Sequence, residues 1–166
     1  MMAMVKAFAY GSGLLEMANV LQYHKIDYLA VAYVDEGVAL RNGGIHVPIM
    51  VMNVDEYGFE TIVQHQLEPE IYSFRILEQF VGFLRRQGLT GYPVHIKIDT
   101  GMHRLGFEPA EMTRLVLQLQ NQPTIYIKSA FSHFTSSEDA ADDLFSRQQG
   151  QVFLECCGLL SAGLGY

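Results

Sequence analysis

The stretch Val5-Lys6-Ala7-Phe8-Ala9-Tyr10-Gly11-Ser12-Gly13 is an apolar run that carries one lysine and then meets a turn with two glycines. Valine, phenylalanine and tyrosine favour strands, and glycine lets the backbone turn sharply after such a run. We therefore expect a buried strand over residues 3–9 that presents Lys6 near its carboxyl end. The plainer interpretation of a single lysine at a strand end is a side chain that reaches solvent.

Outward from this stretch, short apolar runs alternate with longer periodic segments. Runs rich in valine, isoleucine and tyrosine predict further strands at 28–34, 47–53, 70–73, 94–100 and 125–134. Several are almost continuously hydrophobic, as strands buried on both faces are. Helical periodicity follows Ser73, a candidate N-cap, and Pro109, which suits a first helical position. A last helix is predicted from Phe145 to Leu160.

This alternation predicts the class of fold. Strands that alternate with helices over short connections imply parallel strands joined by right-handed crossovers. The pattern fits both a doubly wound sheet and a (β/α) barrel. About six βα units are present, whereas a closed (β/α)8 barrel has eight and occupies about 250 residues. With no internal repeat and no linker, the 166 residues are interpreted as one domain.

Composition excludes several classes of protein. No apolar segment reaches the about 18 residues of a membrane span, and the N-terminus lacks the pattern of a signal peptide. The formal net charge is −7 and the 11 basic residues are scattered, which argues against nucleic acid or an anionic membrane as a partner. The adjacent Cys156 and Cys157 are interpreted as small buried residues, and no cysteine pair has zinc-ligand spacing, so no metal is expected.

The first stretch also suggests a chemistry. A lysine held rigidly and partly desolvated at a strand end is suited to bonding with a carbonyl cofactor. In barrels the catalytic groups lie at the carboxyl ends of strands, where Lys6 falls. The hydroxyl of Tyr10 follows at a spacing that can reach a phosphate oxygen, and Gly11 and Gly13 permit close approach of the backbone.

A second stretch, Lys97-Ile98-Asp99-Thr100-Gly101-Met102-His103-Arg104-Leu105-Gly106-Phe107, carries further ionisable groups. In the strand predicted at 94–100, alternation places His95, Lys97 and Asp99 on one face and apolar residues on the other. Three such groups are costly to bury unless they form a network. Arg104 follows on the next loop, where it can donate to a cofactor oxygen or a carboxylate. The spacing equally allows a structural ion pair between Asp99 and Arg104.

Together the two stretches resemble the signature segments of alanine racemases, and Glu36–Arg41 and Ser132–Phe134 are also similar to that family. The resemblance covers essentially the whole chain. Phe8 and Ser12 depart from it, because the family often has asparagine and histidine there. The resemblance implies that residues 1–166 are a partial (β/α)8 barrel of the TIM type, truncated at both ends, without barrel closure and without the C-terminal β domain.

The resemblance also implies a cofactor, pyridoxal 5′-phosphate (PLP), and roles for single residues. Lys6 would carry PLP covalently and act as one of two bases, Tyr10 would contact the phosphate, and Arg104 would bond the phenolic oxygen of the cofactor. His133 would lie against the pyridine ring or in its hydrogen-bond network, although a lone histidine at a strand end is more often structural. In some relatives the lysine that matches Lys97 is carbamylated, and its anion orients the arginine.

The activity implied for the parent protein is interconversion of L-alanine and D-alanine, which supplies D-alanine for peptidoglycan. The family's second base is a tyrosine of the C-terminal β domain, contributed across a dimer interface, and Tyr166 ends this chain before such a domain. We expect a cytoplasmic homodimer for the parent and an inactive isolated chain. The alternatives are a PLP-dependent decarboxylase of basic amino acids, a single-domain PLP-binding protein of the same barrel fold, and a non-catalytic fragment.

Overall fold

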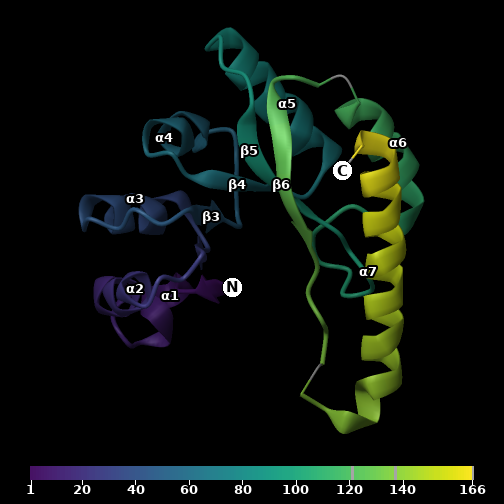
Figure 1. Ribbon diagram of the computed structural model, residues 1–166, viewed down its shortest axis with the longest axis horizontal. Helices are drawn as coiled ribbons and strands as arrows, with labels where there is room; N and C mark the ends of the chain where they lie inside the picture. The colour runs from purple at the N-terminus through teal and green to yellow at the C-terminus, as the bar shows by residue number, and fades with distance from the viewer. Residues whose placement is uncertain (121, 137, 166) are drawn as a thin grey trace. The chain divides into compact units, whose positions relative to one another are not determined.

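The computed structural model describes residues 1–120, 122–136 and 138–165, so Tyr166 lies outside the described residues. The chain forms two compact units, Met1–Glu70 and Ile71–Tyr166. In each unit short parallel strands alternate with helices, as the colours from purple to yellow show in Figure 1. The α/β class predicted from the sequence is therefore present in both units.

Four parallel strands form the first unit: β1 (Met2–Met4), β2 (Tyr28–Val31), β3 (Ile49–Val51) and β4 (Glu68–Ile71). They pair in chain order, with Met4 opposite Ala30, Ala30 opposite Met50 and Met50 opposite Glu68. The residues at the centre of β2 and β3 are almost fully buried, which explains why these strands read as continuous apolar runs.

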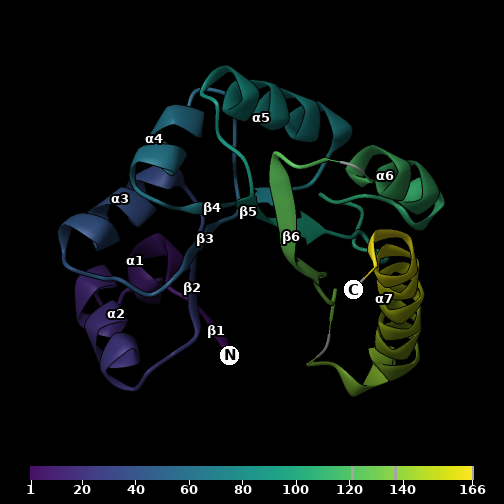
Figure 2. The same ribbon diagram turned by 45° about the horizontal axis from the view of Figure 1, so that its top comes forward.

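Three helices connect these strands: α2 (Leu14–Tyr23), α3 (Val34–Asn42) and α4 (Phe59–Gln64). They lie along one side of the four strands (Figure 2). Leu40 of α3 and Ile62 of α4 are completely buried, so the core of the unit includes the inner faces of these helices. The sequence pattern singles out none of the three, because each is short and α3 carries polar residues through its first and last turns.

The first strand is shorter than the sequence pattern predicts. β1 ends at Met4, and Lys6–Tyr10, labelled α1, is a turn of left-handed helix and not the end of a strand over residues 3–9. Ala7, Phe8, Ala9 and Tyr10 have φ angles of 52°, 59°, 50° and 54°. Such a backbone costs about 1–2 kcal/mol for each residue other than glycine. Local propensity therefore could not predict this turn, and tertiary contacts must maintain it.

Arg41, in the last turn of α3, holds the loops that lead into β3 and β4. Its Nη1 donates to the carbonyl oxygens of Ile45 (2.9 Å) and Val47 (2.8 Å), which precede β3. Its Nε and Nη2 donate to the carbonyl oxygens of His65 (3.0 Å) and Gln66 (3.1 Å), which precede β4. A planar guanidinium with its fixed fork of donors suits this task, and a cation is favourable at a helix C-terminus.

The second unit contains two parallel strands, β5 (Tyr92–Lys97) and β6 (Ile125–Phe131), and three helices, α5 (Phe74–Arg86), α6 (Met112–Leu119) and α7 (Asp143–Leu164). The short 3-10 turns η1 (Pro109–Glu111) and η2 (Ala140–Asp142) lead into α6 and α7. The register shifts within the strand pair, because Val94 lies opposite Ile127 whereas His95 lies opposite Ser129. Lys128 is therefore the extra residue of a β-bulge.

The helices predicted from the sequence in this unit are confirmed. Ser73 is the N-cap of α5, where its Oγ accepts a hydrogen bond from the Ile76 N–H (3.3 Å). Pro109 is the first residue of the turn that opens α6. On α7, Cys156 is buried and Cys157 is half-buried; both thiols are free, and burial raises the pKa of each.

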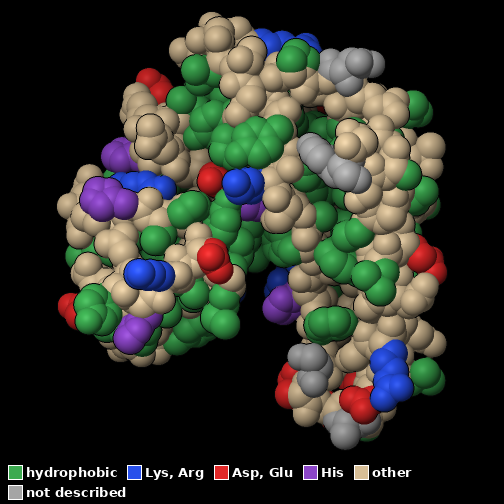
Figure 3. All heavy atoms as spheres, viewed as in Figure 1, with side chains coloured by type: hydrophobic (Ala, Val, Ile, Leu, Met, Phe, Trp, Pro, Cys, Tyr) green, Lys and Arg blue, Asp and Glu red, His purple; other side chains and the backbone are tan. Residues whose placement is uncertain are grey.

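No helix among the described residues combines the length and the apolar character needed to cross a membrane. On the face of the molecule shown in Figure 3, the lysine and arginine side chains of the described residues occupy separate places and form no single stripe.

Candidate active site

The first unit places Lys6 directly after the hydrogen-bond ladder of β1 and β2. The Val5 N–H donates to the Ala30 carbonyl (2.9 Å), so the backbone is fixed up to the residue before Lys6. Lys6 then opens the left-handed turn, and its side chain is half-exposed. Tyr10, at the end of the same turn, is 68% exposed. The turn therefore leaves the Lys6 amine and the Tyr10 hydroxyl accessible, at the end of a segment whose backbone is fixed by hydrogen bonds.

Glu36, near the start of α3, links this turn to the end of β2. Its Oε1 accepts a hydrogen bond from the Ala7 N–H (2.7 Å). Its Oε2 accepts from the N–H groups of Ala32 (2.7 Å) and Tyr33 (3.1 Å). Glu36 is the third residue of α3, a position from which a glutamate can accept from the N-cap N–H of Tyr33, but no sequence pattern predicts its contacts with Ala32 and Ala7.

In the second unit, Lys97 is the last residue of β5 and only 5% exposed. Its Nζ lies 4.7 Å from the centre of the Phe131 ring, its partner in the register with β6, so a cation–π contact stabilises the amine. His95, on the same strand, is completely buried, with Nδ1 2.7 Å from the Ser129 Oγ. The predicted polar face of this strand is thus buried.

Asp99 organises the loop that follows β5. Its Oδ1 accepts hydrogen bonds from the N–H groups of Gly101 (2.9 Å) and His103 (3.1 Å), and its Oδ2 lies 3.8 Å from the His103 Nδ1. Burial acts to raise the pKa of Asp99, but the N–H groups that bond the carboxylate outweigh it and hold the pKa below its ordinary value. Arg104 is exposed on this loop. Among the described residues Asp99 contacts His103 and not Arg104, so the structural ion pair is not formed.

The Asp99 loop closes on itself through Gly106 and Phe107. The Phe107 N–H donates to the Lys97 carbonyl, and the Asp99 N–H donates to the Phe107 carbonyl, both at 2.9 Å. Gly106 has a φ of +123°, and a Cβ there would lie 2.7 Å from the Asp99 nitrogen. Only glycine permits this approach, so Gly106 is what allows the loop carrying Arg104 to end against β5.

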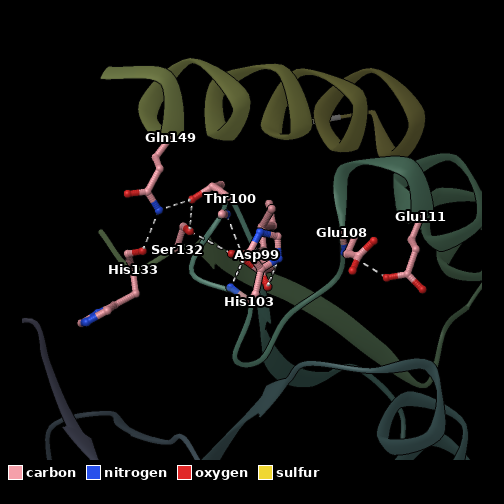
Figure 4. A network of polar contacts seen from close by, with 10 residues as sticks. Asp99, Thr100, His103, Glu108, Glu111, Ser132, His133 and Gln149 are labelled. Atoms are coloured by element: carbon pink, nitrogen blue, oxygen red, sulfur yellow. Dashed lines mark hydrogen bonds and ion pairs between the residues drawn. The ribbon is translucent and has the colours of Figure 1, made fainter. Parts of the chain in front are cut away.

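Gln149, from α7, joins the ends of β5 and β6 (Figure 4). Its side chain is 1% exposed. The amide Nε2 donates to the Thr100 Oγ1 and to the His133 carbonyl, both at 3.3 Å, and Oε1 accepts from the Thr135 N–H (3.1 Å). Thr100 Oγ1 also lies 2.7 Å from the Ser132 Oγ. The sequence contains no local signal for this network, because a glutamine on a helix is usually a surface residue.

A cavity of about 280 Å³ lies beside this network. Its walls come from the end of β6, the loop after it and the middle of α7: Thr100, Ala130, Phe131, Ser132, His133, Phe134, Gln149, Gly150 and Phe153. The His133 side chain itself is exposed, while its carbonyl is held by Gln149. No group of three or more His, Cys, Asp or Glu residues within the described ranges is arranged to hold a metal ion.

The sequence-predicted residues therefore fall into two sets. The first unit brings Lys6 and Tyr10 together on one turn, and the second unit places Lys97, Arg104 and His133 at or after the carboxyl ends of β5 and β6. Parallel strands that alternate with helices and carry the candidate side chains at their carboxyl ends define an α/β protein, of the doubly wound or the barrel class.

Comparison with known proteins gives the family. The model of the family described as "Alanine racemase, N-terminal domain" matches residues 1–165, so the chain belongs to that family. The alanine racemase of Clostridium tetani is 36% identical over 160 residues, which are 95% of this chain and 41% of that protein. The alanine racemase of Thermodesulfovibrio yellowstonii is 40% identical over 139 residues, 82% of this chain and 37% of that protein.

Solved structures of alanine racemases also match the fold of this chain. The alanine racemase of Clostridium difficile 630 matches with a TM-score of 0.90 and 29% identity, over 98% of this chain and 43% of that chain. A structure of the same protein in complex with cycloserine matches with a TM-score of 0.89 over 97% of this chain. The predicted fold class, part of the alanine racemase barrel, is confirmed by these matches. The chain spans about 41% of the length of the first of these curated relatives.

Proposed function

We propose that the protein to which this chain belongs is a PLP-dependent alanine racemase, which interconverts L-alanine and D-alanine. The observation that carries the proposal is the position of Lys6, a half-exposed amine at the start of a backbone turn that directly follows a strand. Membership of the alanine racemase family and relatives with that name support it.

The side chains of the first unit fit PLP. Lys6 supplies a primary amine, the group that bonds covalently to an aldehyde. Tyr10 adds an exposed hydroxyl on the same turn, and a Cβ at Gly11 would meet no atom within 4 Å, so a phosphate has room to approach the backbone. When bound, PLP supplies an electron sink for negative charge at the α-carbon of the amino acid.

Each of the predicted residues then has a proposed role. Lys6 would hold the cofactor and move a proton at the α-carbon of the substrate, and Tyr10 would donate to the phosphate. Arg104 would donate to the phenolic oxygen of the cofactor, and His133 would belong to the hydrogen-bond network of its ring. Lys97, if carbamylated as in some relatives, would supply an anion that orients the Arg104 guanidinium. The exposed positions of Tyr10, Arg104 and His133 leave all three accessible to a ligand.

The first experiment identifies the lysine that holds PLP. Borohydride reduction of the full-length protein loaded with PLP, followed by peptide mapping, should label Lys6. Lys6→Ala should remove the visible absorption of bound PLP together with turnover, whereas Lys128→Ala, which changes an exposed lysine of β6, should leave both unchanged. Label on Lys97 or Lys128 would overturn the assignment.

The second experiment tests whether Lys97 and Arg104 act together. Removing one member of a coupled pair should cost about as much catalytic activity as removing both. The values of kcat/KM for Lys97→Ala, Arg104→Ala and the double variant of the full-length protein give the coupling. Strictly additive losses would show that the two residues are independent.

Residues 1–166 alone should not racemise alanine. A proton is removed from one face of the α-carbon and returned to the other, so one lysine does not serve both faces efficiently. The resemblance implies that the second base is a tyrosine of a C-terminal β domain, and the chain spans 41% of its Clostridium tetani relative. Conversion of L-alanine to D-alanine with added PLP is the assay, and turnover near that of the full-length protein would show that 1–166 contain the complete catalytic set.

The biological role follows from the same proposal. The full-length protein is proposed to be a cytoplasmic homodimer that supplies D-alanine for peptidoglycan. Sedimentation of the full-length protein tests the dimer, and a requirement for external D-alanine in cells that lack the protein tests the role. Release of carbon dioxide from a basic amino acid, without racemisation of alanine, would favour the decarboxylase instead.

A further inference from the structure

The backbone that carries Lys6 is in a conformation that its own residues do not favour. Four consecutive residues other than glycine, Ala7 to Tyr10, have positive φ angles. L-residues avoid this region because the Cβ crowds the following carbonyl oxygen, so such a run persists only where surrounding contacts determine it. Some contact must therefore stabilise the left-handed turn relative to the strand that the sequence pattern predicts.

Contacts within the turn are not sufficient to select it. The Ala9 N–H donates to the Val5 carbonyl (3.0 Å), and the Gly13 N–H donates to the Phe8 carbonyl (3.1 Å). Val5 and Ala9 are buried, but Phe8 and Tyr10 are 67% and 68% exposed. Three of the four residues from Ala7 to Tyr10 are thus exposed, and their side chains contribute little packing that could select the turn.

One contact from elsewhere in the first unit acts at the start of the turn. The Glu36 Oε1 accepts the Ala7 N–H at 2.7 Å, a length typical of a charge-assisted hydrogen bond. Ala7 is the first left-handed residue and the residue after Lys6. The orientation of this N–H is therefore set at the point where the chain departs from β1.

Glu36 is itself firmly held. Its Oε2 accepts from the N–H groups of Ala32 and Tyr33, at the end of β2 and the start of α3. The Ala30 carbonyl, two residues earlier, accepts from the Val5 N–H next to Lys6. The carboxylate is thus a bridge whose two oxygens bind two different loops, and a neutral amide has only one oxygen to offer.

We propose that Glu36 is the positioning residue for Lys6: by holding the Ala7 N–H it selects the left-handed turn and so sets the direction of the lysine amine. Glu36 acts through the backbone and does not itself touch the cofactor or the substrate. The inference rests on the proposed function, in which Lys6 is the residue that bonds PLP.

Glu36→Gln is the most informative change. The amide keeps the size of the side chain but can accept at only one of the two oxygen positions, so it cannot serve Ala7 and the Ala32–Tyr33 pair together. Glu111→Gln is the matched control, because Glu111 also closes a capping box, accepting from the Glu108 N–H at 2.9 Å, in the second unit (Figure 4). Both variants neutralise a glutamate that accepts from an N-cap N–H, but Glu111 serves a single N–H, which an amide oxygen can still accept, and only Glu36 touches the Lys6 turn.

Two measurements on the full-length protein decide the matter. In Glu36→Gln, amide hydrogen exchange at Ala7 should become at least about tenfold faster. The attachment of PLP to Lys6 in the apoprotein, trapped with borohydride, should become at least about tenfold slower. Glu111→Gln should leave both rates within about twofold, because its amide oxygen can still accept from the Glu108 N–H. Glu36→Asp, whose shorter side chain keeps the charge, should recover part of the PLP attachment rate.

The outcomes separate this inference from the proposed function. Unchanged exchange at Ala7 in Glu36→Gln would overturn the positioning role. Faster exchange with an unchanged rate of PLP attachment would overturn it too, because the turn would then not direct the amine. If PLP does not attach to Lys6 in the unaltered protein, the proposed function fails, and hydrogen exchange still decides whether Glu36 selects the turn.

Discussion

The loop that carries Lys6 and the loops that carry Arg104 and His133 are held in different ways. In the first unit a charged, half-buried carboxylate, Glu36, holds a backbone turn of unfavourable conformation. In the second unit a neutral amide, Gln149, is 1% exposed and bonds the ends of both strands. A carboxylate of this kind depends on its charge, whereas a buried amide network depends on packing and on the satisfaction of every polar group. The two units should therefore respond to different perturbations.

The largest effect is expected at Gly106, on which closure of the loop in the second unit depends. In Gly106→Ala the new Cβ would meet the Asp99 nitrogen at 2.7 Å, at a φ of +123°. We expect a loss of about 3 kcal/mol or more in the free energy of unfolding, measured by urea denaturation. Gly88→Ala is the control, since Gly88 has a φ of +69° and an added Cβ meets no atom within 4 Å. A similar loss in both variants would show that close approach of the backbone is unimportant.

The next largest effect is expected at Gln149. In Gln149→Leu the Thr100 hydroxyl, the His133 carbonyl and the Thr135 N–H lose a buried partner, which should cost about 2–3 kcal/mol in urea denaturation. Gln151→Leu changes an exposed glutamine of the same helix, which donates to the Glu155 Oε1 (2.9 Å), and should stay within about 0.5 kcal/mol. Equal losses would contradict a role for the buried network.

A smaller effect, dependent on pH, is expected at Asp99. Its pKa in the folded protein lies below the ordinary value, so the unfolded chain binds the proton more tightly. The carboxylate therefore contributes stability that is fully present above the unfolded pKa of about 3.9 and is lost as the pH falls through the folded pKa. Asp99→Asn should flatten the fall in urea midpoint with acidification over this range. Gln149→Leu, which removes no charge, should keep the slope of the unaltered protein; a slope unchanged by Asp99→Asn would contradict the prediction.

The smallest effect is a gain in stability at Phe8. Phe8 has a φ of +59° and is 67% exposed, so its backbone conformation is unfavourable and its ring gains little packing. Phe8→Asn should raise the free energy of unfolding by up to about 1 kcal/mol, because asparagine tolerates this conformation better. Phe134→Asn, at an exposed phenylalanine with an ordinary φ, should give no gain. A loss at Phe8 would show that its ring contributes more than its backbone costs.

Much of the fold follows from local patterns in the sequence. Ser73 and Pro109 predict where α5 and the turn before α6 begin, because caps and proline act through contacts a few residues away. Continuous apolar runs likewise predict β2 and β3. The end of β1 is predicted wrongly, since Val5 to Tyr10 has the composition of a strand, whereas the folded chain forms a left-handed turn there whose contacts include one with the distant Glu36.

Local sequence patterns predict less of the candidate site than of the fold. Lys6, Tyr10, Lys97, Arg104 and His133 stand out by residue type and by resemblance, but the residues that hold their loops do not. The Ala7–Glu36 contact joins positions 29 residues apart, and the Thr100–Gln149 contact joins positions 49 apart. Sequence spacing reports neighbours on one helix or strand, so contacts between elements appear only once the chain is folded.

Arg41 has a consequence for how this protein can change over evolution. Its guanidinium binds the carbonyl groups before β3 and β4, whereas Lys6 and Glu36 act after the carboxyl ends of β1 and β2. In the first unit the residue that holds the frame and the candidate residues around Lys6 therefore lie on different strands and at opposite ends of the sheet. Substitutions around Lys6 can therefore accumulate without loss of the Arg41 hydrogen bonds that hold the loops before β3 and β4.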